Sequence, residues 1–385
     1  MTRLAFAVVL ALALGASCAP SRTDLAPPPS DGAEAPLRID GDAIVRGVTI
    51  GPIENALHPD VGYGSAAYAR QLDACARMGA TWISLTPFGR VADLSGGGVD
   101  PTFETPFEVN FPRVLTAVRM AHARGLKVML VPHLWVESGE WRGLIDPGTD
   151  ARWAAWAASY EAFILAWARV AEAEQVELFS AGAELRSWVT SGRAPSFSRV
   201  LAAVRREYHG LVTYSANWDD VFDTVILGEL DVIGINAFFP LADHEGATPE
   251  ELLEGGRRVR AKVHALAATW HKPVLFTEMG YTTRRDPAVR PWEWPDSMKG
   301  VVVDEAAQAT AYRALLAPLT DEPAFAGFFV WRVYSDPDDV SQEAEWGFSP
   351  EGKQAEVVLR DAFAARWLGE ARPRGEAAKV PGVWP

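Results

Sequence analysis

Residues 176–217 read VELFSAGAELRSWVTSGRAPSFSRVLAAVRREYHGLVTYSAN and contain one strand–helix–strand repeat. The apolar runs 176–184 and 211–217 are nearly continuous, which is typical of parallel strands covered on both faces. Between them, residues 196–208 form a helical pattern that is basic on one face. The two-residue link His209-Gly210 then returns the chain to the second strand. The stretch therefore predicts a βαβ unit.

The same alternation runs from Arg46 almost to the end of the chain. The expected strands are 45–52, 81–88, 126–134, 176–184, 211–217, 231–238, 273–280 and 326–333. The expected helices are 65–78, 110–124, 150–174, 196–208, a segment that opens with the capping box at 248–251, 304–316 and 353–367, with 219–228 as the weakest candidate. Eight β/α units predict an α/β fold consisting of a single (β/α)8 TIM barrel.

The connections between these elements differ in length according to their direction. Links from helix to strand are as short as Arg124-Gly125, whereas the links from strand to helix include long ones. The long links cover 89–109, 135–149, 280–303 and 333–352. Insertions therefore gather at the carboxyl ends of the strands, which is the face that carries the active site in this fold.

Composition restricts the possible partners. The 385 residues are 49% hydrophobic and 22% charged, as is typical of a globular protein. A formal net charge of −14 without a cluster of Lys and Arg argues against binding to nucleic acid or to anionic membrane surfaces. The seven histidines and two cysteines lack zinc-site spacing, and no nucleotide-binding glycine motif occurs, so neither metal nor cofactor is predicted. The 15 tryptophans fit either a core or a sugar-binding cleft.

The first residues predict export. Residues 4–14 form an apolar run that is too short to span a bilayer but suits a signal peptide. Residues 15–18, GASC, resemble a bacterial lipobox. We therefore expect a signal peptide over 1–18 and a lipid anchor on Cys18 at the periplasmic or cell surface, with an ordinary secretory signal as the alternative. The remaining segments are expected to be a flexible tether (19–43), the barrel domain (44–368) and a C-terminal tail (369–385).

Two acidic residues each end an apolar strand. Glu184 ends the fourth expected strand and Glu278 the seventh, both on the face where active sites lie. Burying an unpaired carboxylate is costly, so such positions normally serve a purpose. Side chains from these two strands can face each other across a barrel mouth. A retaining glycosidase needs two carboxyl groups about 5–5.5 Å apart, so the pair favours glycoside hydrolysis.

The chain also resembles glycoside hydrolase family 113, which belongs to the retaining hydrolases of clan A. The matching segments are 131–143, 179–185, 213–219, 231–241, 272–281, 308–312, 327–333 and 348–356. Because the characterised members of the family are β-mannanases, the resemblance implies a β-mannan or related β-1,4-linked substrate. It also implies that Glu184 is the acid/base and Glu278 the nucleophile of a double displacement.

Two positions depart from the pattern of the clan. Ala183 stands where an Asn that contacts the sugar 2-hydroxyl usually precedes the acid/base, and 237–239 is Ala-Phe-Phe where a Tyr often contacts the nucleophile. Asn217, Asn236 and Tyr281 are candidates to replace these donors. The departures leave open an alternative function, a carbohydrate-binding envelope lipoprotein with impaired catalysis. Transglycosylation is a third, weaker option.

Aromatic and polar residues near the strand ends are the expected sugar contacts, since aromatic faces stack on pyranose rings and amides bind hydroxyls. Trp331 is the best candidate for the floor beneath the reacting sugar. His133 fits a bond to a neighbouring carboxylate equally well, and Asp219 and Asp220 are expected to be solvated. The expected substrate-binding residues are His133, Trp135, Trp141, Arg142, Asn217, Trp218, Asn236, Tyr281 and Trp331. Other tryptophans in or beside the strand-to-helix loops are Trp188, Trp292, Trp294 and Trp346.

Overall fold

The computed structural model describes residues 36–51, 60–102, 105–294, 299–338, 343 and 345–370. These residues all belong to one compact unit, Ala35–Pro385. The expected signal peptide, its Cys18, the tether as far as residue 35 and the tail from residue 371 lie outside the described residues. No helix within the described ranges combines the length and apolar character needed to cross a membrane.

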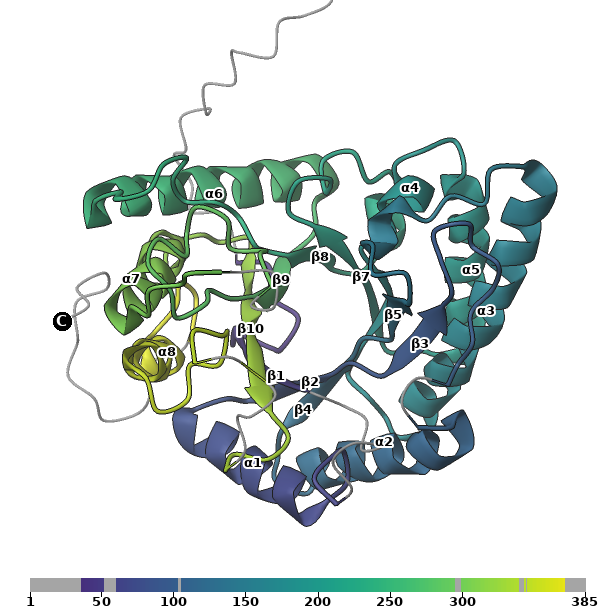
Figure 1. Cartoon of the computed structure of the whole chain (residues 1–385), viewed down its shortest axis with the longest axis horizontal. Helices are drawn as coiled ribbons and strands as arrows, with labels where there is room; N and C mark the ends of the chain where they lie inside the picture. The colour runs from purple at the N-terminus through teal and green to yellow at the C-terminus, as the bar shows by residue number, and fades with distance from the viewer. Residues whose placement is uncertain are drawn as a thin grey trace, which may run out of the picture. The chain divides into compact units, whose positions relative to one another are not determined.

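Eight parallel strands close into a barrel, which confirms the TIM barrel predicted from the sequence (Figure 1). Around the barrel they follow the order β1-β10-β9-β8-β7-β6-β4-β2. Their bounds are β1 Val45–Gly51, β2 Trp82–Leu85, β4 Lys127–Leu130, β6 Leu178–Ala183, β7 Leu211–Asn217, β8 Ile233–Asn236, β9 Val274–Met279 and β10 Phe325–Tyr334.

Two of the expected strands are each interrupted. Residues 81–88 and 126–134 were each expected to form one strand, but the chain leaves the barrel at Pro87 and Pro132. It then forms a second parallel pair, β3 (Phe88–Val91) with β5 (His133–Val136). Proline has no N–H for a ladder, so each strand breaks where its proline stands. This pair extends one side of the barrel beyond its carboxyl end.

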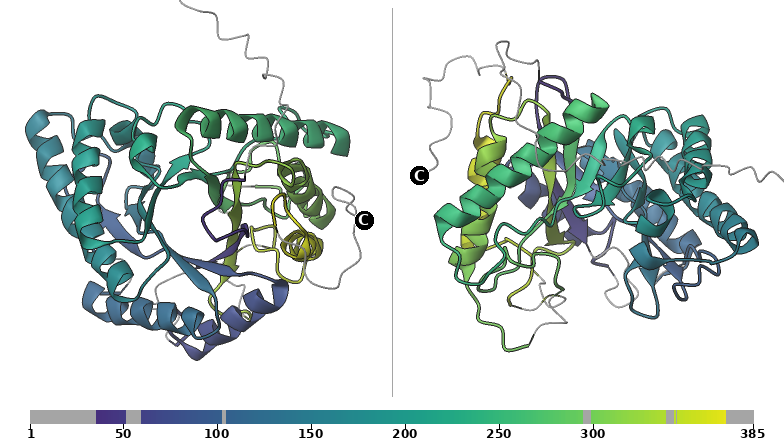
Figure 2. Two further views of the ribbon diagram at one scale, coloured as in Figure 1. Left: turned by 180° about the vertical axis from the view of Figure 1, so that it is seen from behind. Right: turned by 90° about the horizontal axis from the view of Figure 1, so that it is seen from above.

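Helices surround the barrel on its outside (Figure 2). The α-helices are α1 Ala66–Met78, α2 Phe107–His122, α3 Asp150–Ala173, α4 Arg186–Val189, α5 Ala194–Glu207, α6 Pro249–Trp270, α7 Glu305–Leu316 and α8 Gln354–Ala364. The predicted capping box of α6 is present. The helix expected at 219–228 is absent: this segment holds turns, and only the 3-10 helix η2 (Leu227–Glu229) follows.

Side chains alternate along the barrel strands between two clusters. In β9, for example, Phe276 belongs to the large cluster that includes the helices, whereas Leu275 belongs to a smaller cluster contributed mainly by the strands. Trp82 and Phe329 meet edge to face in the smaller cluster, with ring centroids 6.3 Å apart. The alternation places this cluster inside the barrel, as expected of a packed interior. The barrel is therefore filled below its mouth.

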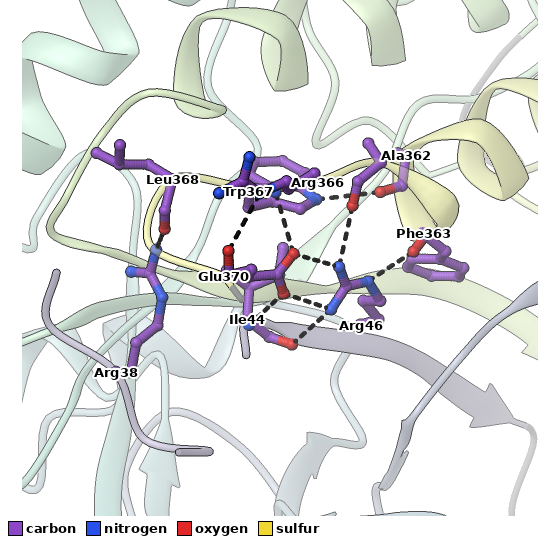
Figure 3. A network of polar contacts seen from close by, with 10 residues as sticks. Arg38, Ile44, Arg46, Ala362, Phe363, Arg366, Trp367, Leu368 and Glu370 are labelled. Carbon is purple, nitrogen blue, oxygen red and sulfur yellow. Dashed lines mark hydrogen bonds and ion pairs between the residues drawn. The ribbon is translucent and has the colours of Figure 1, made fainter. Parts of the chain in front are cut away.

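A largely buried ion pair joins the two ends of the barrel domain (Figure 3). Arg46 of β1 binds both carboxylate oxygens of Glu370 at 2.8 Å and also donates to the carbonyl of Phe363 at 2.6 Å. Each partner's side chain is 12% exposed. Arg38 donates nearby to the carbonyl of Leu368. Residues flanking the expected domain boundaries therefore contribute to closing the fold.

Candidate active site

Glu184, the expected acid/base, follows directly on β6. Its φ of 56° lies in the left-handed region, and its amide donates to the Ser215 carbonyl over 2.9 Å. The next amide, that of Leu185, donates to the Tyr214 hydroxyl over 2.6 Å. A non-glycine residue in this conformation must be held by its surroundings, and such positions cluster at functional sites. Contacts with β7 therefore fix the direction in which the Glu184 side chain leaves the strand.

Three donors surround the carboxyl group of Glu184, a residue that is only 8% exposed. The indole N–H of Trp141 donates to Oε2 over 2.8 Å, and Nη2 of Arg142 lies 3.2 Å from the same oxygen. The Asn236 amide donates to Oε1 over 3.1 Å. Asn236 in turn accepts a hydrogen bond from the Thr277 hydroxyl over 3.0 Å, which fixes the orientation of its amide. Both oxygens of Glu184 are therefore bonded to donors.

Glu278, the expected nucleophile, lies within β9 and is 5% exposed. Its Oε1 is 3.0 Å from Nε2 of His133, whose Nδ1 is 2.8 Å from the Val131 carbonyl oxygen. Because a carbonyl only accepts, Nδ1 carries a proton. Nε2 then either accepts a hydrogen bond from the protonated carboxyl group of Glu278 or, in the imidazolium, donates one to its carboxylate. In either state His133 and Glu278 share one proton.

The surroundings shift the pKa values of the two carboxyl groups in opposite directions. Burial raises the pKa of Glu184, but the charge of Arg142 and two hydrogen bonds outweigh burial, so this pKa lies below its ordinary value. Burial also raises the pKa of Glu278, and this rise persists although the hydrogen bond with His133 opposes it. The two groups titrate as a pair, and these environments direct their first proton toward Glu278.

An aromatic floor lies beside the two carboxyl groups. Trp331 of β10 stacks on His133, with ring centroids 6.2 Å apart and an interplanar angle of 28°. Phe238 and Phe348 pack with Trp331 in one cluster, and Trp218 packs against its edge. Trp331 is 7% exposed, so the face left to solvent is small. The role of Trp331 as a floor beneath a sugar stays a prediction.

Two further tryptophans form an exposed rim. Trp292 stacks on Trp218 with ring centroids 5.2 Å apart, and Trp294 lies 6.4 Å from Trp331 by the same measure. Trp292 is 46% exposed and Trp294 43%, so each has a face in contact with water. Both residues come from the long connection after β9. The rim therefore continues the aromatic floor outward.

The structure brings seven of the expected site residues together. They are His133, Trp141, Arg142, Glu184, Asn236, Glu278 and Trp331. Trp218 lies at the edge of the floor, and Trp135, 44% exposed, is two residues beyond His133 on the same side of β5. Asn236, one of the three candidates to compensate for Ala183, contacts the expected acid/base.

Other expected residues have different partners. Asn217 pairs in register with Asn236, but its side-chain amide donates to Asp219 over 2.8 Å. Tyr281 is 1% exposed and packs edge to face on Tyr312, with centroids 5.3 Å apart, which leaves no surface for a sugar. Trp188 is 1% exposed and belongs to the core rather than to the cleft wall. Reading the sequence could not separate these residues from the cleft, because all follow strands closely.

A charged cluster behind Trp141 was missed by the sequence analysis. Arg186 lies over the Trp141 ring, 4.5 Å from its centre, and forms ion pairs with Asp219 and Asp220. The expectation that Asp220 is solvated is wrong: it is 4% exposed, and burial raises its pKa to about 6. The sequence did contain a signal for this cluster. Arg186 follows Glu184 by two residues, and the neighbouring pair Asp219-Asp220 can neutralise its charge.

No cluster of three or more metal-ligating side chains occurs within the ranges that the structure describes.

Comparison with known proteins adds independent information. The sequence model of Glycoside Hydrolase Family 113 matches residues 58–353. A solved GH113 β-mannanase from Alicyclobacillus acidocaldarius is 26% identical; the alignment covers 85% of this chain and 98% of that one, with a TM-score of 0.72. A second GH113 β-1,4-mannanase structure is 21% identical over 84% of this chain and 99% of that one, with a TM-score of 0.69.

A more distant likeness supports the fold alone. A family 5 mannosidase from Rhizomucor miehei is 12% identical, covering 86% of this chain and 97% of that one, with a TM-score of 0.62. No match was found among curated proteins.

Proposed function

This chain belongs to glycoside hydrolase family 113, and from that premise we propose that it is a retaining hydrolase of a β-linked, mannan-like glycan. In this proposal Glu278 is the nucleophile and Glu184 the acid/base. The observation that carries it is the pair itself: two buried carboxyl groups at the ends of β6 and β9, each held by its own donors beside an aromatic floor. Two such groups with different environments suit the two roles of this chemistry.

The reaction proceeds in two displacements. Glu278 attacks the anomeric carbon while Glu184 gives its proton to the glycosidic oxygen, which leaves with the aglycone. Water then attacks the anomeric carbon of the glycosyl–Glu278 ester. Glu184 takes the proton of that water, and the carboxylate of Glu278 leaves. Trp331 supports the sugar ring in both steps through its exposed face.

The proton must move within the pair before the first step. The donors around Glu184 favour its ionised form, whereas the acid has to be protonated. A glycosidic oxygen beside Glu184 can accept a hydrogen bond only from the protonated form, and a sugar hydroxyl that donates to Glu278 favours its carboxylate. We infer that substrate binding exchanges the protonation states of the two groups.

The substrate class rests on the relatives. The two family 113 structures compared above are β-mannanases, and the alignment with this chain covers almost the whole of each. We therefore propose β-1,4-mannan or a related β-1,4-linked glycan as the substrate. For its location we propose an exported protein held to a membrane by lipid on Cys18, supported by the apolar run and the lipobox-like GASC.

The test assigns the two roles separately. Glu184→Gln and Glu278→Ala variants are assayed on manno-oligosaccharides and on an aryl β-mannoside whose leaving group needs no proton. We expect Glu184→Gln to lose about 10²–10⁴-fold on the oligosaccharides and much less on the aryl glycoside, since only the former needs a general acid. Glu278→Ala is expected to lose activity on both. The reverse pattern would exchange the roles, and full activity in either variant would remove that residue from the mechanism.

A panel of β-linked glycans assayed with the wild-type protein, with Glu278→Ala as its control, tests the substrate class. Release of reducing ends from mannan above that control supports the proposal. Binding of oligosaccharides without such release would favour the alternative, a carbohydrate-binding lipoprotein with impaired catalysis. The observation that favours this alternative is Ala183, which stands where an Asn usually precedes the acid/base.

A further inference from the structure

Arg186 is the first residue of α4, two residues after Glu184, and it packs on the face of Trp141. Its guanidinium carbon is 4.5 Å from the centre of the Trp141 ring. The N–H at the edge of the same ring donates to Oε2 of Glu184 over 2.8 Å. A planar guanidinium stacks well on an aromatic face, so this contact restrains the orientation of the ring. Arg186 therefore reaches the proposed acid/base through the indole of Trp141.

Two aspartates hold Arg186 in this place. Its Nε donates to Oδ2 of Asp220 over 2.9 Å, and its Nη2 donates to Oδ1 of Asp219. Asp220 is 4% exposed, and its second oxygen accepts from the backbone N–H of Asn217 over 3.1 Å. The Asn217 side chain donates to Asp219 over 2.8 Å. Because two nitrogens of the guanidinium are bonded to partners that are themselves held, the group has little freedom to turn away from the ring.

Trp141 depends on its neighbours for its position, because it comes from the connection between β5 and α3 rather than from a barrel strand. Its ring lies against Gly143, where a Cβ atom would come within 2.3 Å of the indole. Only a glycine leaves room for the ring at that point. Together, Gly143 and Arg186 restrict where the indole can lie, and the direction of its N–H is restricted with it.

The residues that hold Arg186 follow β7 directly, and β7 also supports the backbone of Glu184. The Glu184 amide donates to the Ser215 carbonyl over 2.9 Å, and Asn217, which bonds to both aspartates, is the last residue of β7. The end of β7 therefore supports Glu184 at two places. It holds the backbone directly, and it holds the carboxyl group through Arg186 and Trp141.

We propose that Arg186 is a positioning residue for the acid/base. Held by Asp219 and Asp220, it keeps the Trp141 indole in the orientation that bonds to Glu184, and this places the Glu184 carboxyl group for proton transfer to the glycosidic oxygen. Proton transfer needs the acid within hydrogen-bond reach of that oxygen, and a small displacement of a catalytic group lowers the rate strongly. This inference rests on the proposed function, because it deepens how the same site works.

The experiment separates positioning of the acid from general support of the fold. Wild type, Arg186→Met and Arg186→Lys are assayed for kcat/KM on manno-oligosaccharides and on an aryl β-mannoside whose leaving group needs no proton. We expect Arg186→Met to lose about 10- to 100-fold on the oligosaccharides and much less on the aryl glycoside, since only the former needs the acid. Equal losses on both substrates would overturn the inference.

Arg186→Lys tests the part played by charge alone. It keeps a cation beside the two aspartates, so the folded state keeps its ion pairs, but it lacks the planar group that lies on the ring. We expect it to recover only a small part of the activity that Arg186→Met loses on the oligosaccharides. Full activity in Arg186→Lys would mean that the charge suffices, and would overturn the inference.

A double-mutant cycle tests whether Arg186 acts through the indole. In a Trp141→Phe background the N–H is already lost, so Arg186→Met should add little to the loss on the oligosaccharides. Losses that multiply would mean that Arg186 acts by another route, and would overturn the inference. Arg193 gives a matched control, because it lies 5.6 Å from the ring centre of Trp153 and pairs with Asp150. Arg193→Met should leave kcat/KM unchanged on both substrates.

A measurement without turnover keeps this inference distinct from the proposed function. In protein with isotope-labelled tryptophans, NMR resolves the indole N–H signals, and the signal of Trp141 is the one that Trp141→Phe removes. A hydrogen bond to a carboxylate shifts an N–H signal away from that of an indole in water. In Arg186→Met and Arg186→Lys the Trp141 signal should move toward the position of an exposed indole, whereas Arg193→Met should leave it in place.

That movement supports the positioning of the Glu184 carboxyl group by Arg186 even if no variant hydrolyses either substrate, an outcome that would remove the proposed function. Hydrolysis of mannan by the wild type, together with an unmoved Trp141 signal and full activity in Arg186→Met, supports the proposed function and contradicts the inference.

Discussion

Trp141 donates its indole N–H to Oε2 of Glu184 over 2.8 Å, so the proposed acid is held by a donor that favours its ionised form. The same ring carries Arg186 on its face, 4.5 Å from the guanidinium carbon. Arg186 therefore packs on one face of the Trp141 indole, while the N–H at the edge of this ring bonds to the carboxyl group of Glu184. Its contribution to the acidity of Glu184 can be separated from its contribution to packing.

Trp141→Phe removes the donor but keeps a ring beneath Arg186. The pKa of Glu184 should rise, because a hydrogen bond to its ionised form is lost. In the free protein Glu184 has the lower pKa of the pair, so its titration sets the acid limb of the kcat/KM profile, and this limb should move up by about one pH unit. Trp153→Phe is the control, since the Trp153 indole donates to Asp146 at 3.2 Å, in a place away from the two glutamates. An acid limb that stays in place or moves down would refute this role.

His133→Phe should act on the opposite limb. His133 lowers the pKa of Glu278 against the larger effect of burial, so its removal should raise that pKa further. Because Glu278 has the higher pKa of the pair in the free protein, its titration sets the alkaline limb of kcat/KM, which should move to higher pH so that the profile broadens. The phenyl ring keeps an aromatic ring against Trp331. A shift of the acid limb alone would contradict this effect of His133 on Glu278.

Glu351 should make the folded state less stable at neutral pH than at acid pH. Burial raises its pKa from 4.5 to about 7, although Gln71 donates to it over 2.6 Å. The unfolded chain loses this proton first, so the free energy of unfolding should fall as pH rises from about 4.5 to about 7, by about 3 kcal/mol in all. Glu351→Gln should be more stable than wild type above pH 7.

The difference between Glu351→Gln and wild type should vanish below about pH 4, where the carboxyl group is protonated in both the folded and the unfolded state. Denaturant titrations of the two proteins at several pH values measure it. A constant difference across this pH range would show that the carboxyl group does not titrate with a raised pKa in the folded state.

Glu370 anchors the C-terminal end of the fold to Arg46 of β1 (Figure 3). Arg46→Met should destabilise the domain by about 3–5 kcal/mol, because it leaves a largely buried carboxylate without its partner. The control is Arg70→Met: Arg70 is 52% exposed and pairs with Asp336 and Asp338, so its loss should cost about 1 kcal/mol or less. Equal melting temperatures for both variants would contradict a structural role for the Arg46–Glu370 pair.

The barrel could be predicted because its signals are local. Near-continuous apolar runs such as 211–217 identify parallel strands, and the Thr248 capping box marks the start of α6. Glu184 and Glu278 were recognisable because a carboxylate at the end of such a run is unusual. The helix expected at 219–228 does not form. The backbone N–H of Asn217 donates to the Asp220 carboxylate, and the chain begins a turn there instead.

The finer arrangement of the site depends on contacts between distant segments. Tyr281 and His133 both adjoin strand ends, yet Tyr281 turns toward α7 and the core while His133 turns toward Glu278. Which side of a strand a residue occupies after a bulge or break depends on register, and β6, β9 and β10 all have register shifts near their carboxyl ends. The partner of Asp220, Arg186, likewise comes from a separate element, α4.

The central claim is a double displacement through Glu278, and the stereochemistry of the first product tests it most directly. Proton NMR during the first minutes of manno-oligosaccharide hydrolysis distinguishes the anomers before they equilibrate. Two inversions at the anomeric carbon predict that the β-anomer forms first and converts slowly to the equilibrium mixture. Initial formation of the α-anomer would mean a single displacement by water and would contradict the proposed mechanism.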